Sequence, residues 1–503
     1  MSRIRSLSEF VIALISGLLL ACSFPLPGLS LLAWVALVPM ILIMARRPFV
    51  TGFVAGVGFF AFSLYWLNIV MVTYGRLHPL LSLVAYLLLV LYLALYFGLA
   101  TWLCCRLSSR LGYPYAMTLP LIWVALEYLR GIVLTGFPWN LLGYSQVENL
   151  AIIQSADLVG VYGVSGLIVL SNAVIAAILN WFGHRERRFG QVRYVLLLLI
   201  LVVANLVYGT WRLGGQSDAG KPIKLAVAQG NIDQTAKWDI ANQVHTVETY
   251  LRLSKRAAAE GADLVIWPES ATPFYLQDIS PPQTAVVKFV QNAGISLLTG
   301  SPAYEQHGAD FRYFNSAYMI SPRGRLADRS DKVHLVPFGE YVPFSRFFPF
   351  IDKLVYGIGD FSAGEIAPLD YDGKKVGVLV CYEAIFPELA RAYSKAGSQL
   401  LVNITNDAWF GRSSAPYQHL VMARVRAVEN RRWLARAANT GVSALIAPDG
   451  RVVEQSKLFE EAVMTGPVFM RDQLTLYARF GDIFPLFFLV VSLVWIWQSR
   501  LRK

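Results

Sequence analysis

The sequence predicts two parts of different fold class: a multi-pass α-helical membrane domain of about eight helices, and an α/β domain with two sheets packed back to back. Of the 503 residues, 55% are hydrophobic and only 15% are charged, whereas soluble domains carry about 25% charged residues. The apolar residues concentrate in 9–213 and 483–497. Residues 220–470 have an ordinary soluble composition and are numerous enough to bury a core of their own.

The apolar regions divide into segments that must be helical, because lipid offers no partner for backbone polar groups. Several are shorter than the ~20 residues that span a bilayer, so flanking residues must extend them. The eight segments are Phe10–Ser23, Ser30–Ala45, Val50–Val72, Leu80–Cys105, Ala116–Leu129, Val161–Phe182, Val195–Trp211 and Ile483–Trp497. A lipoprotein-type signal ending at Cys22 is the alternative for the first segment, and an uncleaved helix is the preferred interpretation.

Lysine and arginine are distributed unequally between the loops, which predicts the orientation of the helices. Short outside loops carry little beyond Arg76 and Arg130. The expected cytoplasmic segments carry Arg3, Arg5, Arg46, Arg47, Arg106, Arg110, Arg185, Arg187, Arg188, Arg193, Arg500, Arg502 and Lys503. We therefore predict cytoplasmic termini, seven helices in 1–213, an extracytoplasmic domain in 214–478, and an eighth helix with a cytoplasmic tail in 479–503.

Hydrophobic periodicity alternates between strand and helix in the second part. The predicted strands are Lys224–Ile232, Leu264–Trp267, Ser296–Thr299, Ser316–Ile320, Val376–Cys381, Leu400–Ile404 and Ala444–Ile446. The predicted helices are Asn242–Glu260, Thr284–Asn292, Pro387–Ala396 and His419–Arg432. Pro448–Arg451 is typical of a tight hairpin turn. This alternation indicates an α/β fold with mixed sheets.

Several function classes are excluded or disfavoured by composition and motifs. The net charge is +11, but many of the basic residues flank apolar stretches as membrane topology requires, so we expect no nucleic-acid partner. The four cysteines form no CxxC and the six histidines show no metal-ligand spacing, so neither a disulfide framework nor a metal site is expected. Walker, dinucleotide-binding and Gly-x-Ser-x-Gly motifs are absent from the sequence.

Three residues at the ends of predicted strands have the chemistry of a cysteine-dependent acyl transfer. Cys381 ends the apolar run 376–381, Glu269 follows 264–266, and Lys332 precedes 336–340. Each alone has an ordinary explanation, as a buried thiol, a loop acid and a surface lysine. Together, a carboxylate, an ammonium and a thiol at strand ends are the parts of a nucleophilic acyl-transfer site.

Two other polar clusters are explained more simply. Ordinary turn chemistry accounts for Asn406 and Asp407. About half of the charged residues of the helix 419–432 are expected to form a solvated face or pairs four residues apart. Glu429 in that helix is a candidate to hold a partner residue of the active site.

The segments Trp267-Pro268-Glu269, Lys332 with Pro337–Glu340, and Cys381-Tyr382-Glu383 resemble the carbon–nitrogen hydrolase (nitrilase) superfamily in order and spacing. The resemblance implies a four-layer α-β-β-α sandwich. It implies that Glu269 is the general base, that Lys332 stabilises the thiolate and the oxyanion, and that Cys381 is the nucleophile. Glu340 corresponds to a second essential glutamate, and Tyr382 and Glu383 are expected to support the nucleophile.

With its membrane helices, and with Thr135–Asn140 in an outside loop, the whole chain resembles the bacterial apolipoprotein N-acyltransferase family. The resemblance implies that a phospholipid acylates the cysteine, and that the acyl chain then passes to the α-amino group of a diacylglyceryl-cysteine on an apolipoprotein. It implies no metal or organic cofactor, ping-pong kinetics, and a place in the bacterial inner membrane. A monomer is expected.

An aromatic stretch, 343–350, follows Glu340 directly. We hypothesise that it is an arm that dips into the membrane interface and gates lipid entry; packing against the domain is the alternative. The candidate access residues are Trp238, Phe344, Phe347 and Phe348.

Two competing functions remain open from the sequence. A membrane-tethered amidase or nitrilase shares the three catalytic residue types but needs only one anchor. A transporter with an external domain predicts paired charges or broken helices in the membrane, for which Glu127, Arg130 and Asp157 are the candidates.

Overall fold

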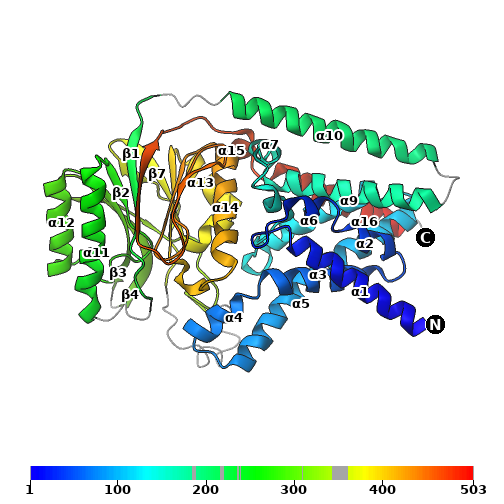
Figure 1. The fold of residues 1–503 in the computed structure, drawn as a ribbon, viewed down its shortest axis with the longest axis horizontal. Coiled ribbons are helices and arrows are strands. Elements are labelled where there is room, and N and C mark those ends of the chain that lie inside the picture. Colours follow the sequence, from blue (N-terminus) through cyan, green and yellow to red (C-terminus); the bar gives the residue numbers. More distant parts are fainter. Residues whose placement is uncertain are drawn as a thin grey trace. The chain divides into compact units, whose positions relative to one another are not determined.

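The computed structural model describes residues 2–183, 188–215, 220–234, 237, 240–308, 310–342 and 361–501. The chain forms two compact units (Figure 1). The membrane unit comprises residues 1–72, 78–215 and 480–503, and the α/β unit comprises 73–77 and 216–479.

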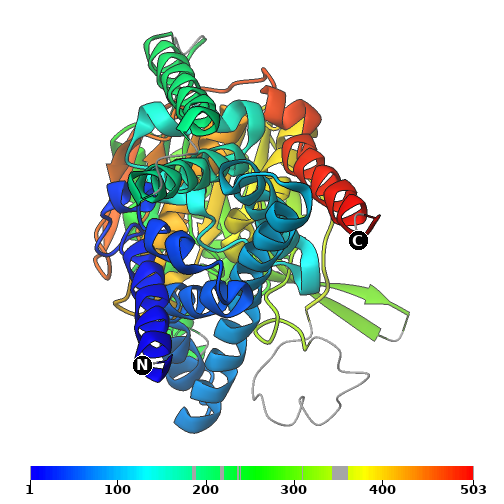
Figure 2. The same cartoon turned by 90° about the vertical axis from the view of Figure 1, so that its right-hand side faces the viewer.

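The membrane unit consists of helices (Figure 2). They are α1 (Ser2–Ala21), α2 (Val38–Ile43), α3 (Pro48–Ser63), α4 (Leu67–Ile69), α5 (Pro79–Leu111), α6 (Tyr115–Ile132), α7 (Leu150–Ile153), α8 (Ala156–Val159), α9 (Val161–Gly183), α10 (Arg188–Gly214) and α16 (Ile483–Leu501). Among the described residues, five helices, α5, α6, α9, α10 and α16, are long and apolar enough to cross a membrane. A sixth span is possible if α3 and the helical segment 67–74 are counted together, although the pair bends by 55°.

The described residues thus give five or six full-length spans where about eight helices were predicted. The first two predicted crossings form shorter apolar helices, Leu7–Ala21 and Ser30–Ile43. The second of these is broken between a 3-10 turn, Ser30–Trp34, and α2, which has a proline in its first turn. Hydropathy alone does not reveal this break, because the residues on both sides of it are apolar.

Helices α1, α3 and α5 pack with their backbones in close contact, as small residues allow. A Cβ atom on Gly17 would lie 1.9 Å from the carbonyl oxygen of Ala55, and one on Gly52 would lie 2.3 Å from that of Phe97. Glycine is therefore required at both positions for this packing.

The polar residues proposed for a transport path instead hold the ends of helices. Arg130 donates to the carbonyl oxygens of Phe137 and Trp139, at 3.1 and 2.8 Å. Glu127 accepts from the indole of Trp123 and from the backbone N–H of Leu142. Asp157 forms an ion pair of 2.9 Å with Arg212 and accepts from Tyr208. These contacts explain the three charged residues structurally.

The α/β unit contains two six-stranded mixed sheets. The first has the order β12-β1-β2-β3-β4-β5 and the second β11-β10-β9-β8-β7-β6. The strands are β1 (Ile223–Gln229), β2 (Leu264–Ile266), β3 (Ser296–His307), β4 (Asp310–Ile320), β5 (Leu326–Asp331), β6 (Leu369–Tyr371), β7 (Lys374–Val380), β8 (Leu400–Thr405), β9 (Leu434–Ala438), β10 (Ala444–Ile446), β11 (Val452–Gln455) and β12 (Ala462–Val468).

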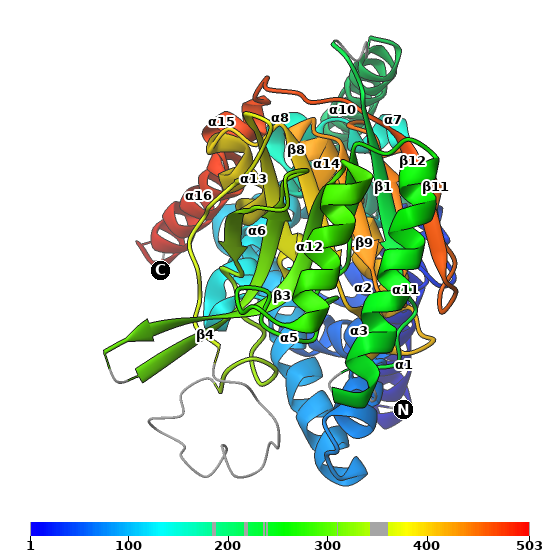
Figure 3. The same ribbon diagram turned by 90° about the vertical axis from the view of Figure 1, so that its left-hand side faces the viewer.

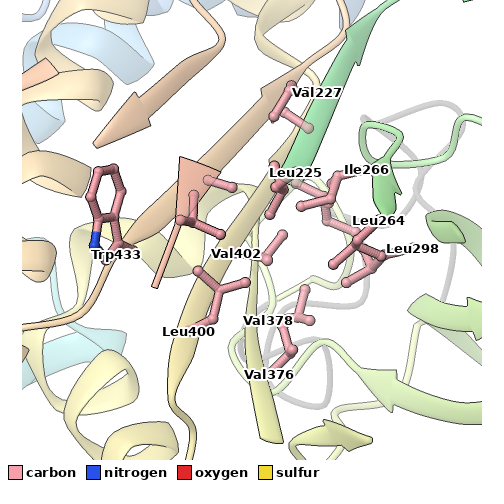
Figure 4. Packing of buried hydrophobic residues seen from close by; sticks show 14 of the residues in the cluster. Leu225, Val227, Leu264, Ile266, Leu298, Val376, Val378, Leu400, Val402 and Trp433 are labelled. Carbon is pink, nitrogen blue, oxygen red and sulfur yellow. The ribbon is translucent and has the colours of Figure 1, made fainter. Parts of the chain in front are cut away.

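The two sheets lie face to face over one apolar core. Leu225, Ile266 and Leu298 from the first sheet meet Val378 and Val402 from the second (Figure 4). Helices α11 (Ile240–Ala259) and α12 (Pro281–Ala293) cover the outer face of the first sheet (Figure 3). Helices α13 (Pro387–Lys395) and α14 (Ala415–Asn430) cover the outer face of the second. The predicted four-layer α-β-β-α sandwich is confirmed.

Candidate active site

Glu269 lies on a loop that leaves β2 and crosses close above β3. Gly300 of β3 makes this crossing possible, since a Cβ atom there would lie 2.5 Å from the backbone nitrogen of Ser270. Ser270 itself adopts a left-handed φ of 48°. The ammonium of Lys237, which is buried, donates to the backbone carbonyl of Glu269 at 3.1 Å. The loop therefore has a defined shape that aims the Glu269 carboxylate inward.

Lys332 follows β5 directly, and its ammonium is buried between two carboxylates. Its Nζ atom lies 2.9 Å from Glu340 Oε2 and 4.0 Å from Glu269 Oε1. Asn315 of β4 connects the same two carboxylates, because its Nδ2 donates to Glu269 Oε1 at 2.8 Å and to Glu340 Oε1 at 3.0 Å. One ammonium and one amide thus hold both glutamates in place.

Cys381 comes immediately after β7 and begins a 3-10 helix, Cys381–Ile385. It has a left-handed φ of 54°, a conformation that costs about 1–3 kcal/mol for a residue with a side chain. Its side chain packs against the edge of the inter-sheet core and is partly exposed. Strain of this kind persists only where the surroundings impose it, and it turns the thiol out of the line of the strand.

Glu383 ties the cysteine to the segment that carries the lysine. Its carboxylate accepts from the backbone N–H of Val380 at 2.6 Å, and from those of Val333 and His334 at 2.6 and 2.9 Å. Burial raises the pKa of Glu383 to about 7, although the three backbone donors oppose this shift. Glu383 is therefore a structural bridge between the residues next to Lys332 and those next to Cys381.

The electrostatics of the site keep the thiol protonated in the resting enzyme. Desolvation raises the pKa of Cys381 and the nearby Glu269 carboxylate raises it further, and Lys332 only partly offsets them. Burial lowers the pKa of Lys332, but Glu340 and Glu269 outweigh burial and the net pKa is raised. These directions favour the protonated forms of both the Lys332 ammonium and the Cys381 thiol, so a base is needed to take the proton of the thiol.

Some sequence-predicted residues lie outside the described part of the chain. These are Trp238, Phe344, Phe347 and Phe348. The hypothesis of an aromatic access arm therefore stays a prediction. Tyr382 is described, and its ring contacts that of Phe386 with centroids 5.1 Å apart.

Two explanations from the sequence were wrong. Asp407 is not simply a turn residue: it is buried, forms an ion pair with Arg436 at 2.6 Å, and lies 3.1 Å from Nδ1 of His419. The charged residues of the 419–432 segment do not form a solvated face. Arg424, Arg426, Glu429, Asn430, Arg431 and Arg432 are all buried. Each of these residues makes at least one internal hydrogen bond instead. Glu429 forms an ion pair of 3.0 Å with Arg426.

Asn315 was not identified from the sequence, because one amide in a strand has no distinctive pattern.

Replacing Asn315 with leucine should remove the donor that holds Glu269 and Glu340 while preserving volume. We expect activity to fall about tenfold to a hundredfold, the equivalent of the 1–3 kcal/mol that an unsatisfied buried acceptor costs. The matched control is Asn292→Leu on α12, which should leave activity unchanged. Full activity of Asn315→Leu, measured as acyl transfer per folded enzyme, would show that the hydrogen bonds from Asn315 to Glu269 and Glu340 are unnecessary.

Among the described residues, no group of three or more His, Cys, Asp or Glu side chains is arranged to hold a metal ion. The centre of the described site holds the Cys381 thiol, the Glu269 and Glu340 carboxylates and the Lys332 ammonium. Groups of these kinds can supply a nucleophile, a base and an electrostatic stabiliser.

Comparisons with known proteins identify the family. The carbon-nitrogen hydrolase family profile matches residues 224–472, and that of the apolipoprotein N-acyltransferase N-terminal domain matches 16–174. An apolipoprotein N-acyltransferase of Geobacter metallireducens is 48% identical over 95% of this chain and 92% of the relative. The chain belongs to the apolipoprotein N-acyltransferase family. Relatives of the same name from Chromobacterium violaceum and Nitrosomonas europaea are 36% and 33% identical, over 89% and 94% of this chain and 85% and 92% of their own lengths.

Membership of this family confirms the predicted enzyme class and the predicted superfamily of the α/β unit. A solved amidase of the nitrilase superfamily from Nesterenkonia, 22% identical, covers 53% of this chain and 96% of its own, with a TM-score of 0.38. Together with the apolar helices, family membership makes the chain a membrane enzyme of the acyltransferase class.

Proposed function

We propose that the chain transfers a fatty acyl group from a membrane phospholipid to the α-amino group of the diacylglyceryl-cysteine of apolipoproteins, through a thioester on Cys381. The observation that carries this proposal is a buried ammonium between two carboxylates, with a partly exposed thiol under the influence of both Glu269 and Lys332. The names of the full-length relatives support the choice of substrates.

In the first half-reaction, Glu269 takes the proton of the Cys381 thiol. The site carries the same net charge before and after this transfer, because the thiol becomes an anion as the carboxylate becomes neutral. The thiolate attacks the ester carbonyl of the phospholipid. Lys332 and the backbone N–H of Tyr382 stabilise the oxyanion of the tetrahedral intermediate. The lysophospholipid leaves as an alcohol and takes the proton back from Glu269.

In the second half-reaction, the acceptor amine attacks the thioester carbonyl and gives its proton to Glu269. Collapse of the tetrahedral intermediate expels the Cys381 thiolate, which regains a proton from Glu269. Glu340 holds Lys332 in place throughout, because its two oxygens lie 3.0 and 2.9 Å from Nζ. Two successive substrates and one covalent intermediate predict ping-pong kinetics.

The distribution of lysine and arginine between the loops supports the proposed topology. Both termini lie in the cytoplasm and residues 214–478 form the catalytic domain on the periplasmic side of the inner membrane. Residues 1–213 and 479–503 supply the membrane helices. A lipid substrate requires the catalytic cysteine to be reachable from the bilayer surface. We propose a monomer.

The test is a transfer assay with the purified full-length chain. It uses vesicles of phosphatidylethanolamine with a labelled sn-1 chain and a diacylglyceryl-cysteine peptide, with a small-amide hydrolysis assay in parallel. N-acylation of the peptide that is lost in Cys381→Ser supports the proposal. Hydrolysis of amides without transfer to the peptide would favour the tethered amidase, and transfer by Cys381→Ala would remove the thioester from the mechanism.

A further inference from the structure

The carbonyl oxygen of the nucleophilic cysteine is held by two buried side chains that the proposed mechanism does not use. His419 of α14 places Nε2 at 3.1 Å from the Cys381 carbonyl oxygen. Asn403 of β8 donates from Nδ2 to the same oxygen at 3.4 Å, and to that of Leu379 at 2.9 Å. Both side chains are fully buried. A carbonyl oxygen only accepts, so the Nε2 atom of His419 has to carry a proton.

Arg436 of β9 fixes the orientation of the Asn403 amide. Its Nη1 atom donates to Asn403 Oδ1. An arginine has no acceptor, so the atom of Asn403 that faces it must be the oxygen. The amide nitrogen of Asn403 is thereby directed at the Cys381 carbonyl.

Arg436 and Asp407 hold the other side of the His419 ring. The Nη2 atom of Arg436 lies 3.1 Å from His419 Nδ1 and 2.6 Å from Asp407 Oδ2. Nη2 can only donate and the carboxylate of Asp407 can only accept, so Nδ1 lies between a donor and an acceptor, and the proton on Nε2 follows from the Cys381 carbonyl alone. The Oδ1 atom of Asp407 is 3.1 Å from the same Nδ1, and it has its own donor in the hydroxyl of Thr405 at 2.9 Å.

Burial and neighbouring charges both act on the pKa values of Asp407 and His419. Burial raises the pKa of Asp407, but Arg436 and His419 outweigh it and bring the pKa to about 2. Burial and Arg436 lower the pKa of His419, against the opposing effect of Asp407. Asp407 and Arg436 therefore form a charged pair beside the imidazole.

We propose that Arg436 and His419, with Asn403 and Asp407, are positioning residues that polarise the peptide between Cys381 and Tyr382. This inference rests on the proposed function. A peptide group is conjugated, so donors on its oxygen draw electron density from its nitrogen and strengthen its N–H as a donor. That N–H belongs to Tyr382 and is the group proposed to stabilise the oxyanion. The network thus acts on the oxyanion of the transition state through the Cys381–Tyr382 peptide, without contacting the substrate.

Hydrogen bonds also hold the backbone that precedes Cys381. The polarised peptide therefore has a fixed direction. Glu383 accepts from the N–H of Val380 at 2.6 Å, on the other side of Cys381. The left-handed φ of 54° at Cys381 turns the next peptide plane away from the strand. The carbonyl then points to α14 and β8, and the N–H of the same peptide points the opposite way, as it must in a trans peptide.

The experiment separates polarisation of the oxyanion site from placement of the thiol. His419→Leu removes the donor, His419→Gln keeps an N–H in nearly the same place, and Met422→Leu, one turn further along α14, is the matched control. Each full-length variant is tested in two reactions of Cys381. One is single-turnover acylation by phosphatidylethanolamine vesicles, which passes through an oxyanion. The other is alkylation by iodoacetamide, which does not.

We expect His419→Leu to slow acylation about tenfold or more, because a weakened oxyanion donor is worth a part of the 10²–10³-fold of a deleted one. Alkylation should stay within about threefold of the wild type, and His419→Gln should restore most of the acylation rate. Equal losses in both reactions would mean that the network only places the thiol, and unchanged acylation would overturn the proposal as well.

Two other results would need a different interpretation: a His419→Leu variant that does not fold, and a wild type that forms no acyl-enzyme. If His419→Leu does not fold, Asn403→Ser removes the other donor and is judged by the same pair of rates. If the wild type itself forms no acyl-enzyme while it is alkylated normally, the proposed function has failed. In that case the role of the network in oxyanion stabilisation falls with it.

Discussion

Glu269→Gln is expected to lower the rate of acyl-enzyme formation about 10²–10⁴-fold, the usual contribution of a general base. The amide is nearly isosteric with the carboxylate and still accepts from Asn315, so the fold should be retained. The loss is large because burial of the Cys381 thiol, which this substitution leaves in place, raises the thiol pKa and disfavours the thiolate.

The pH dependence gives this prediction a second readout. Without a base, the residual rate depends on the fraction of Cys381 already ionised. Burial, the largest cause of the raised thiol pKa, remains in this variant although the Glu269 charge is removed, so the rate of Glu269→Gln should rise steadily from pH 7 to pH 10. Glu305→Gln, a change of the half-exposed partner of Arg329, is the control and should behave as the wild type. A wild-type rate for Glu269→Gln would assign the base to another group.

Lys332→Met is expected to affect both activity and stability. It removes the cation that stabilises the thiolate and oxyanion, which should lower acylation about 10²–10³-fold. It also leaves Glu269 and Glu340 buried without their ammonium, which should destabilise the fold by about 3–5 kcal/mol. Thermal unfolding of the detergent-solubilised enzyme measures the second effect.

A double variant separates the two effects of the lysine. Lys332→Met with Glu340→Gln removes one buried charge of each sign, so it should recover much of the lost stability but none of the activity. Lys288→Met, on the exposed side of α12, is the matched control. Recovery of activity in the double variant would mean that the ammonium balances Glu340 and takes no part in the chemistry.

The sequence predicts the class of both units well, because composition and periodicity report burial directly. The strands Leu264–Trp267 and Leu400–Ile404 were predicted within one residue of the observed β2 and β8. By contrast, β9 was missed. It is buried and contains Arg436, and a central arginine does not resemble a core strand until its partners, Asp407 and Asn403, are known.

The residues of the candidate site likewise include some that the sequence predicts and some that only the structure reveals. Glu269, Lys332 and Cys381 were predicted because Glu269 and Cys381 stand at the ends of apolar runs and Lys332 stands just before the segment 336–340. Asn315, Asp407 and His419 were not found as site residues, because their importance lies in contacts across 12 to 46 residues of chain. Such contacts are set by how the sheets and α14 pack, and local sequence patterns do not report them.

The central claim is that the acyl chain passes through a thioester on one cysteine. The direct measurement is mass spectrometry of the purified chain after incubation with phosphatidylethanolamine vesicles and no acceptor. We predict a fatty-acyl adduct on the peptide that contains Cys381, cleaved by neutral hydroxylamine and discharged when a diacylglyceryl-cysteine peptide is added. Acylation of the acceptor by an enzyme that never carries the adduct, or an adduct on Cys22, Cys104 or Cys105 instead, would contradict it.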